Sequence, residues 1–126
     1  MDDTELIQGT WKLESTTDQN GNSIGSAGIL GLKVSGDRMD EWLDQDAIDA
    51  AGETEVVSKF KLSSNTSPKR IVLVSNWFDD NGPYPSHTEK GFYELTADTL
   101  TIKWGPDDFP KAGLNEYCQT CVYTRQ

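Results

Sequence analysis

The sequence predicts an all-β protein folded as an eight-stranded antiparallel up-and-down β-barrel, with one short helical segment near residues 44–52. Short runs of apolar and β-branched residues alternate with turn residues along the chain, and no long segment repeats at helical spacing. Eight such runs fit within the 126 residues. Closing eight antiparallel strands into a barrel removes the unpaired edges of an open sheet. A sandwich of two sheets is the alternative, but short turns between successive runs favour sequence neighbours lying side by side.

The predicted strands cover residues 10–15, 29–34, 38–43, 56–62, 70–75, 89–95, 99–104 and 117–125. The first strand alternates apolar and polar residues from Trp11 onward, and an Asn-Gly turn signal at residues 20–21 follows it. Leu30, Leu32 and Val34 share one face of the second strand. A tight Ser-Gly-Asp turn joins the second strand to the third, so we expect these two strands to form a hairpin.

Residues 44–52 predict one or two helical turns, because acidic residues begin the segment, alanines fill it and Gly52 ends it. We expect this segment to act as a connector or a lid. The fourth strand alternates from Val56 to Leu62. The fifth strand, over residues 70–75, has apolar side chains on both faces, which is typical of a strand covered on both sides.

Residues 76–87 predict a long loop, because they combine a glycine and two prolines with three aromatic residues. Loops of this length are uncommon unless they have a function. The sixth and seventh strands form a hairpin around residues 96–98, and a proline-containing loop at residues 105–113 precedes the last strand. Aromatic residues gather in these loops and at strand ends, where a barrel has its rims: Trp42, Trp77, Phe78, Tyr84, Trp104, Phe109 and Tyr117.

The two ends of the chain predict how one end of the barrel is sealed. Trp11 follows Gly9 at the start of the first strand, and Arg125 lies near the end of the last strand. We expect the indole of Trp11 to plug one end of the barrel, with the guanidinium of Arg125 across its face. Both residues are therefore predicted to be structural.

Several stretches resemble a bacterial lipocalin-like domain family of the calycin type: residues 6–13, 36–38, 60–62, 68–71 and 91–102. The longest of them is similar to that family's hairpin of Tyr, Glu and Leu, a turn, then Asp, Thr and Leu. The stretch before the last strand keeps only the acidic and aromatic positions of the family's pattern. The resemblance implies a lipocalin-like barrel and a small-molecule cavity, without a known reaction.

Charge and length exclude several classes of protein. The chain carries 11 Lys and Arg against 21 Asp and Glu, a formal net charge of −10, which repels phosphate backbones and anionic lipid surfaces. We therefore expect no nucleic-acid and no membrane partner. No apolar run approaches the roughly 20 residues that cross a bilayer. We expect one soluble domain over residues 1–126, cytoplasmic as given, or secreted if a leader was removed.

No group of residues predicts catalysis or metal binding. His87 is the only histidine, and the glycines of a nucleophile elbow are missing. Cys118 and Cys121 form half of a zinc site without further ligands. Residues three apart on a regular strand point to opposite faces, so we expect two free thiols. The sequence therefore predicts no catalytic residue, no metal and no cofactor.

We expect a small-molecule binding protein that holds an apolar or aromatic ligand in its barrel. Candidate lining residues lie on strands and are large enough to contact an interior ligand: Met39, Phe60, Tyr93, Trp104 and Tyr117. The inward face of the third strand stays open, because Met39, Trp42 and Leu43 do not share one parity. Ligand identity and oligomeric state also stay open.

Two other functions remain as alternatives. One is a barrel enzyme that catalyses an isomerisation or cyclisation mainly by shaping its substrate, which needs few acidic or basic groups. A buried Asp, Glu or Tyr at the cavity floor would favour it. The other is a protein interaction module that uses the apolar loop from Trp77 to Tyr84 as a patch. A filled barrel interior would favour that third hypothesis.

Overall fold

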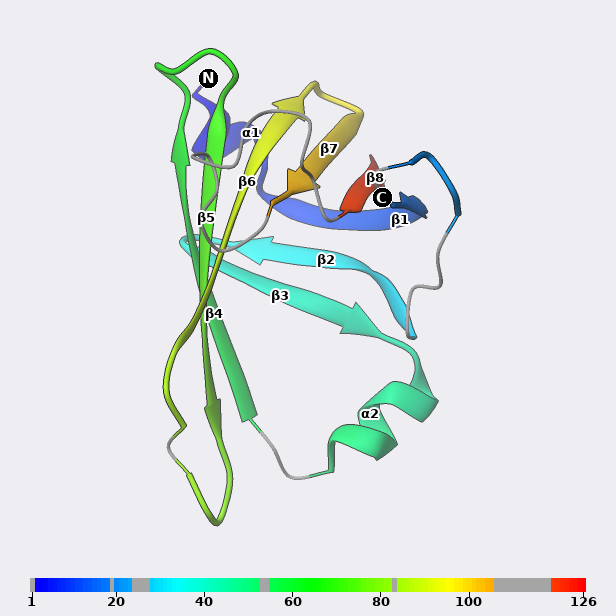
Figure 1. Ribbon diagram of the computed structural model, residues 1–126, viewed down its shortest axis with the longest axis vertical. Coiled ribbons are helices and arrows are strands. Elements are labelled where there is room, and N and C mark those ends of the chain that lie inside the picture. Colours follow the sequence, from blue (N-terminus) through cyan, green and yellow to red (C-terminus); the bar gives the residue numbers. More distant parts are fainter. Residues whose placement is uncertain (1, 19, 24–27, 53–54, 83, 106–118) are drawn as a thin grey trace.

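The chain folds as a closed barrel of eight antiparallel strands, which confirms the predicted fold class (Figure 1). The computed structural model describes residues 2–18, 20–23, 28–52, 55–82, 84–105 and 119–126. Each strand pairs with its neighbours in sequence, and the last strand pairs with the first. The elements in chain order are α1 (Asp3–Leu6), β1 (Gly9–Thr17), β2 (Ile29–Ser35), β3 (Arg38–Leu43), α2 (Gln45–Ala51), β4 (Glu55–Ser63), β5 (Arg70–Phe78), β6 (His87–Leu95), β7 (Thr99–Trp104) and β8 (Gln119–Arg125).

Both helices begin at an aspartate that caps the first turn. The side chain of Asp44 accepts a hydrogen bond from the backbone N–H of Ala47 at 2.8 Å, so α2 forms where the sequence predicts a helical segment. The side chain of Asp2 accepts a hydrogen bond from the backbone N–H of Glu5 at 2.9 Å and caps α1, which is not among the predicted elements. No helix among the described residues has the length and apolar character needed to span a bilayer.

Strand β5 is longer than predicted, and the loop after it is shorter. Trp77 and Phe78 continue the strand, where they pair with Val56 and Glu55 of β4. The connection to β6 is therefore confined to residues 79–86, and the expected long loop over residues 76–87 is wrong at both of its ends. The reason is that β4 extends far enough to supply backbone partners, and aromatic side chains favour strand geometry.

A β-bulge changes the facing of side chains in β2. The pairing with β3 skips a residue between Ile29 and Gly31, so Leu30 is the extra residue and is 40% exposed. The expectation that Leu30 shares a face with Leu32 and Val34 is therefore wrong, because the bulge interrupts the alternation. Gly31 is required beside the bulge, since a Cβ atom there would lie 1.8 Å from the carbonyl oxygen of β1 at Trp11.

One end of the barrel is packed solid. Ile7, Trp11, Ile71, Leu100 and Ile102 have no exposed surface, and they belong to one apolar cluster. The indole Nε1 of Trp11 donates a hydrogen bond to the carbonyl of Ile7 at 2.8 Å, which satisfies the polar atom of the buried ring. This end of the barrel is therefore a filled core.

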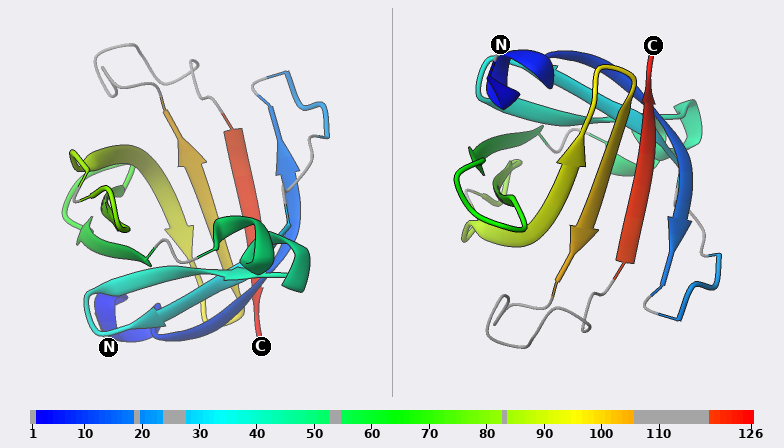
Figure 2. Two further views of the ribbon diagram at one scale, coloured as in Figure 1. Left: turned by 90° about the horizontal axis from the view of Figure 1, so that it is seen from below. Right: turned by 90° about the horizontal axis from the view of Figure 1, so that it is seen from above.

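The side chain of Arg125 lies across the face of the Trp11 ring, with Cζ 4.2 Å from the ring centroid. Its guanidinium also donates hydrogen bonds to three backbone carbonyls, those of Leu6, Gln8 and Ala97. These contacts tie the end of β8 to the segment before β1 and to the turn between β6 and β7. Both chain termini accordingly lie at this end of the barrel (Figure 2).

Strands β3 and β4 are joined by far fewer contacts than the other neighbours. Their register contains the single pair Arg38↔Lys59, whereas β4 and β5 pair continuously from Glu55↔Phe78 to Ser63↔Arg70. Figure 1 shows β3 and β4 running apart from that point, with α2 at the far end. The strand order thus closes the barrel, but β3 and β4 separate beyond the Arg38↔Lys59 pair, and we call this separation the seam.

Replacing Arg125 with alanine is expected to lower the free energy of unfolding by about 3 kcal/mol, because three carbonyls lose a charged donor and the indole loses its cation. Urea denaturation measures the change. Arg125→Lys should fall in between, since it keeps the charge but not the three-way hydrogen bonding. Arg70→Ala, at an exposed position of β5, is the matched control and should change stability by less than about 0.5 kcal/mol. Equal effects of Arg125→Ala and Arg70→Ala would contradict the role of the plug.

Candidate functional site

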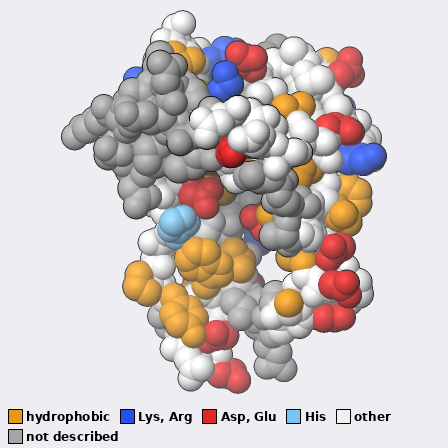
Figure 3. Space-filling view, turned by 45° about the vertical axis from the view of Figure 1, so that its right-hand side comes forward, with side chains coloured by type: hydrophobic (Ala, Val, Ile, Leu, Met, Phe, Trp, Pro, Cys, Tyr) orange, Lys and Arg blue, Asp and Glu red, His pale blue; other side chains and the backbone are white. Residues whose placement is uncertain are grey.

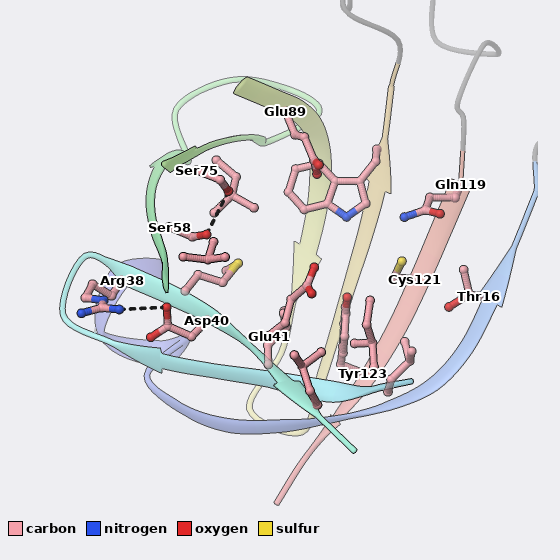
Figure 4. Close-up of a pocket in the computed structure, with 18 of the residues that line it drawn as sticks. Thr16, Arg38, Asp40, Glu41, Ser58, Ser75, Glu89, Gln119, Cys121 and Tyr123 are labelled. Atoms are coloured by element: carbon pink, nitrogen blue, oxygen red, sulfur yellow. Dashed lines mark hydrogen bonds and ion pairs between the residues drawn. The ribbon is translucent and has the colours of Figure 1, made fainter. Parts of the chain in front are cut away.

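The barrel holds an open cavity of about 600 Å³ on the side of the core away from the plug. All eight strands contribute side chains to its walls (Figure 4). Cavities of roughly 300–1,000 Å³ are the size that encloses a small organic ligand. The interior is therefore divided into a filled half and a hollow half.

Strand alternation explains which side chains reach the cavity. On β4 and β5 the inward residues include Ser58, Ser75 and Trp77, and on β8 they include Cys121 and Tyr123. Successive residues of a strand point to opposite faces, so every second residue of these strands faces the barrel interior. The hydroxyl oxygens of Ser58 and Ser75 lie 2.9 Å apart on one wall.

The five lining residues expected from the sequence take three different positions. Met39 and Trp104 line the cavity and are 2% and 8% exposed. Phe60 and Tyr93 also face inward, but they belong to the packed core and are not among the residues that line the cavity. Tyr117 lies outside the described residues. Alternation along a strand predicts which side chains face the barrel interior, but it does not predict how far along the barrel axis they lie. Phe60 and Tyr93 face inward as expected but lie in the filled half.

Tyr93 fixes the N-terminal helix to the barrel. Its hydroxyl donates a hydrogen bond to the carboxylate of Asp3 at 2.6 Å, and the ammonium of Lys69 lies 2.9 Å from the same carboxylate. The bond from Tyr93 and the charge of Lys69 hold the pKa of Asp3 below its usual range. Burial, and then the contact with Asp3, raise the pKa of Tyr93. This residue therefore has a structural role.

Two glutamates from separate strands point into the cavity, Glu41 on β3 and Glu89 on β6 (Figure 4). Glu41 is open to water in the lumen, yet the surrounding walls remove part of its hydration. This desolvation raises the pKa of Glu41, and the negative charge of Glu89 raises it further. Glu89 also lies 3.3 Å from Nε2 of His87, whose ring packs against Trp77. The lumen thus contains two carboxylates that repel each other.

The wall formed by β1 and β8 carries a thiol and two hydroxyls. Thr16 pairs with Cys121 across the two strands, and Tyr123 follows on β8. Cys121 is a free, buried cysteine. Burial raises the pKa of the Cys121 thiol and of the Tyr123 hydroxyl, and the charges of Glu41 and Glu89 act in the same direction. A thiol of raised pKa stays protonated near neutral pH and is a poor nucleophile.

Positive charge is scarce in the cavity. Among the described residues that line it, Arg38 is the only lysine or arginine, and its guanidinium is 3.2 Å from the carboxylate of Asp40. Both residues lie where β3 and β4 part. In the described part of the chain no three His, Cys, Asp or Glu side chains gather closely enough to hold a metal ion. The lumen is therefore an apolar and aromatic space with a negative charge.

Sequence reasoning missed the carboxylates, although a signal for Glu41 was present. Met39, Glu41 and Leu43 share the inward face of β3, whereas Trp42 faces outward, where the ammonium of Lys33 lies 5.9 Å from its ring centroid. Choosing the parity of the two aliphatic residues would have placed Glu41 inside. Glu89 had a weaker signal, because its strand begins with several exposed polar residues.

Comparison with known proteins does not assign the chain to a family. No protein-family model, no curated protein and no solved structure matches the chain. The resemblance to a bacterial lipocalin-like family therefore stays a prediction from sequence motifs.

Glu41→Gln is expected to stabilise the protein at neutral pH. Because the fold raises the pKa of Glu41, ionising this group costs stability in the folded state. The cost is absent below the unfolded-state pKa of about 4.3 and complete above the folded-state pKa. We expect Tm to rise by about 2 °C near pH 7, with the gain lost near pH 4.

The measurement is thermal unfolding followed by circular dichroism across this pH range. Glu94→Gln is the matched control, because Glu94 lies exposed on the outer face of β6 and loses the same charge on substitution. A Glu41→Gln protein no more stable than Glu94→Gln at neutral pH would contradict the desolvation of Glu41.

Proposed function

We propose that this protein binds a small apolar or aromatic molecule inside its barrel. The observation that carries the proposal is the cavity of about 600 Å³ beside a core that is fully packed. Protein interiors normally pack as densely as organic crystals, and unfilled interior volume lowers stability. A barrel that fills one half of its interior and leaves the other half hollow is best explained by a ligand.

The walls suit a ligand with a flat or apolar body. Leu13, Leu32 and Leu73 supply aliphatic surface, and the indoles of Trp77 and Trp104 supply aromatic surface. Aromatic rings gain from stacking in addition to the area that they bury. A few hydroxyl and carboxylate groups among these apolar side chains give the ligand a fixed orientation.

The seam between β3 and β4 offers a route to the cavity. Arg38 and Asp40 both line the cavity although they alternate with the inward residue Met39, so the hollow extends to the parted edge of β3. Figure 3 shows an opening on this side of the molecule, with hydrophobic and acidic side chains beside it. A ligand can enter between the two strands without passing the plug.

An enzyme is the second candidate function, and three residues that line the cavity favour it: Glu41, Glu89 and the buried Tyr123. A carboxyl group of raised pKa that shares a lumen with another carboxylate is the arrangement of a general acid and a general base. A protein interaction module has less support, because binding a partner through an outer apolar patch does not require a cavity inside the barrel. Mass spectrometry of a ligand incubated with the protein separates the first two candidates: a binding protein returns it unchanged, and an enzyme converts it.

N-phenylnaphthylamine, a neutral apolar dye, is expected to gain fluorescence on binding, with saturation at micromolar concentration. Ser75→Trp should weaken binding at least about tenfold, because the new indole fills the lumen. Val74→Trp is the control, since Val74 is the neighbour on β5 that points away from the cavity. The proposal is wrong if the folded protein leaves the dye unchanged, or if both variants bind it equally well.

A further inference from the structure

We propose that the ligand is an organic cation, with an apolar or aromatic body and a protonated amine that lies between the carboxylates of Glu41 and Glu89. This inference rests on the proposed function and names the chemical class of the ligand. It is carried by three features of the same cavity: the placement of the two carboxylates, the absence among the described lining residues of any lysine or arginine other than the Asp40-paired Arg38, and the aromatic walls.

The two carboxylates reach the lumen from different walls. Glu41 extends from β3 and Glu89 from β6, strands that are not neighbours in the barrel order (Figure 4). The charge of Glu89 nevertheless acts on Glu41, and both charges act on Cys121 and Tyr123 of β8. A small charged group of a ligand inside the lumen would therefore interact electrostatically with both carboxylates.

The described residues of the cavity wall place no free cation beside this pair. The guanidinium of Arg38 lies at the seam, is 45% exposed on its side chain and is held by Asp40. His87 lies 3.3 Å from Glu89 but is not among the residues that line the cavity, and both side chains are about half exposed, at 47% and 46%, so water screens that contact. A cation placed inside the lumen relieves the repulsion of Glu41 and Glu89, whereas an anion increases it.

The aromatic residues favour the same kind of ligand. Trp77, Trp104 and Tyr123 line the cavity that contains the two carboxylates. The face of an aromatic ring attracts a cation, and the attraction is larger where water is partly excluded. A protonated amine also donates charge-assisted hydrogen bonds to carboxylates, which are stronger than those between neutral groups. A fatty acid or a phosphate ester is an anion, so the two carboxylates would repel it.

The test uses three fluorescent probes that share one dansyl body and differ only at the end of an alkyl chain. Dansylcadaverine ends in an amine, N-hexyl dansylamide is neutral, and N-dansyl-aminohexanoate ends in a carboxylate. The cation is expected to bind about tenfold more tightly than the neutral probe, and the anion at least about tenfold more weakly. Fluorescence titration at fixed ionic strength gives all three affinities.

Variants locate the preference within the lumen. Glu41→Gln and Glu89→Gln should each weaken dansylcadaverine about fivefold and leave the neutral probe unchanged, because each removes one carboxylate. The double variant should lose the preference for the cation. Glu94→Gln removes one negative charge from outside the cavity, as the other two single variants do from inside it, and it should retain the affinity of the unmodified protein.

The outcomes separate this inference from the proposed function. If the three probes bind equally and Ser75→Trp blocks all of them, the lumen binds ligands but does not select cations. If the cation is preferred and Glu94→Gln weakens it as much as Glu41→Gln does, the preference comes from the overall charge, and the inference is wrong. If none of the probes binds, and N-phenylnaphthylamine does not bind either, the proposed function itself fails.

Discussion

The barrel depends on the contact between Arg125 and Trp11, because it joins the last strand to the first at the point where the chain must close. The guanidinium covers the indole and also donates to the carbonyls of Leu6, the last residue of α1, and of Gln8, at a helix end where backbone acceptors lack partners within the helix. One side chain thus fixes both termini and the turn between β6 and β7. With that end held by hydrogen bonds and by a fully buried core, the other half of the barrel can remain hollow without loss of the fold.

The hollow half concentrates the polar chemistry of the interior. The hydroxyls of Ser58 and Ser75 form a hydrogen bond with each other. The carboxylates of Glu41 and Glu89 carry charge of the same sign and repel each other across the lumen. The fold tolerates this arrangement because water reaches both carboxylates. Under the proposed function, unfavourable charge kept in the free state would give the site selectivity, since only a ligand of complementary charge removes the repulsion.

The topology was predictable from sequence, but the position of the cavity along the barrel was not. Turn residues and alternation are local signals, and they placed eight strands and helix α2 near their observed bounds. The bulge at Leu30 and the extension of β5 through Phe78 depend on the partner strand, which a local pattern does not reveal. For the same reason Phe60 and Tyr93 have the inward facing of cavity residues yet lie in the packed core.

The parted seam recreates, within a closed barrel, the kind of unpaired strand edge that closure normally eliminates. Such edges invite pairing with strands of other molecules, and proteins commonly guard them with charged side chains. Asp40 and Glu41 on β3 and Glu55 on β4 place charges on both strands, on the parted side of the Arg38↔Lys59 pair. These charges oppose edge-to-edge pairing with a strand of another molecule, so the two edges can stay unpaired in the barrel wall.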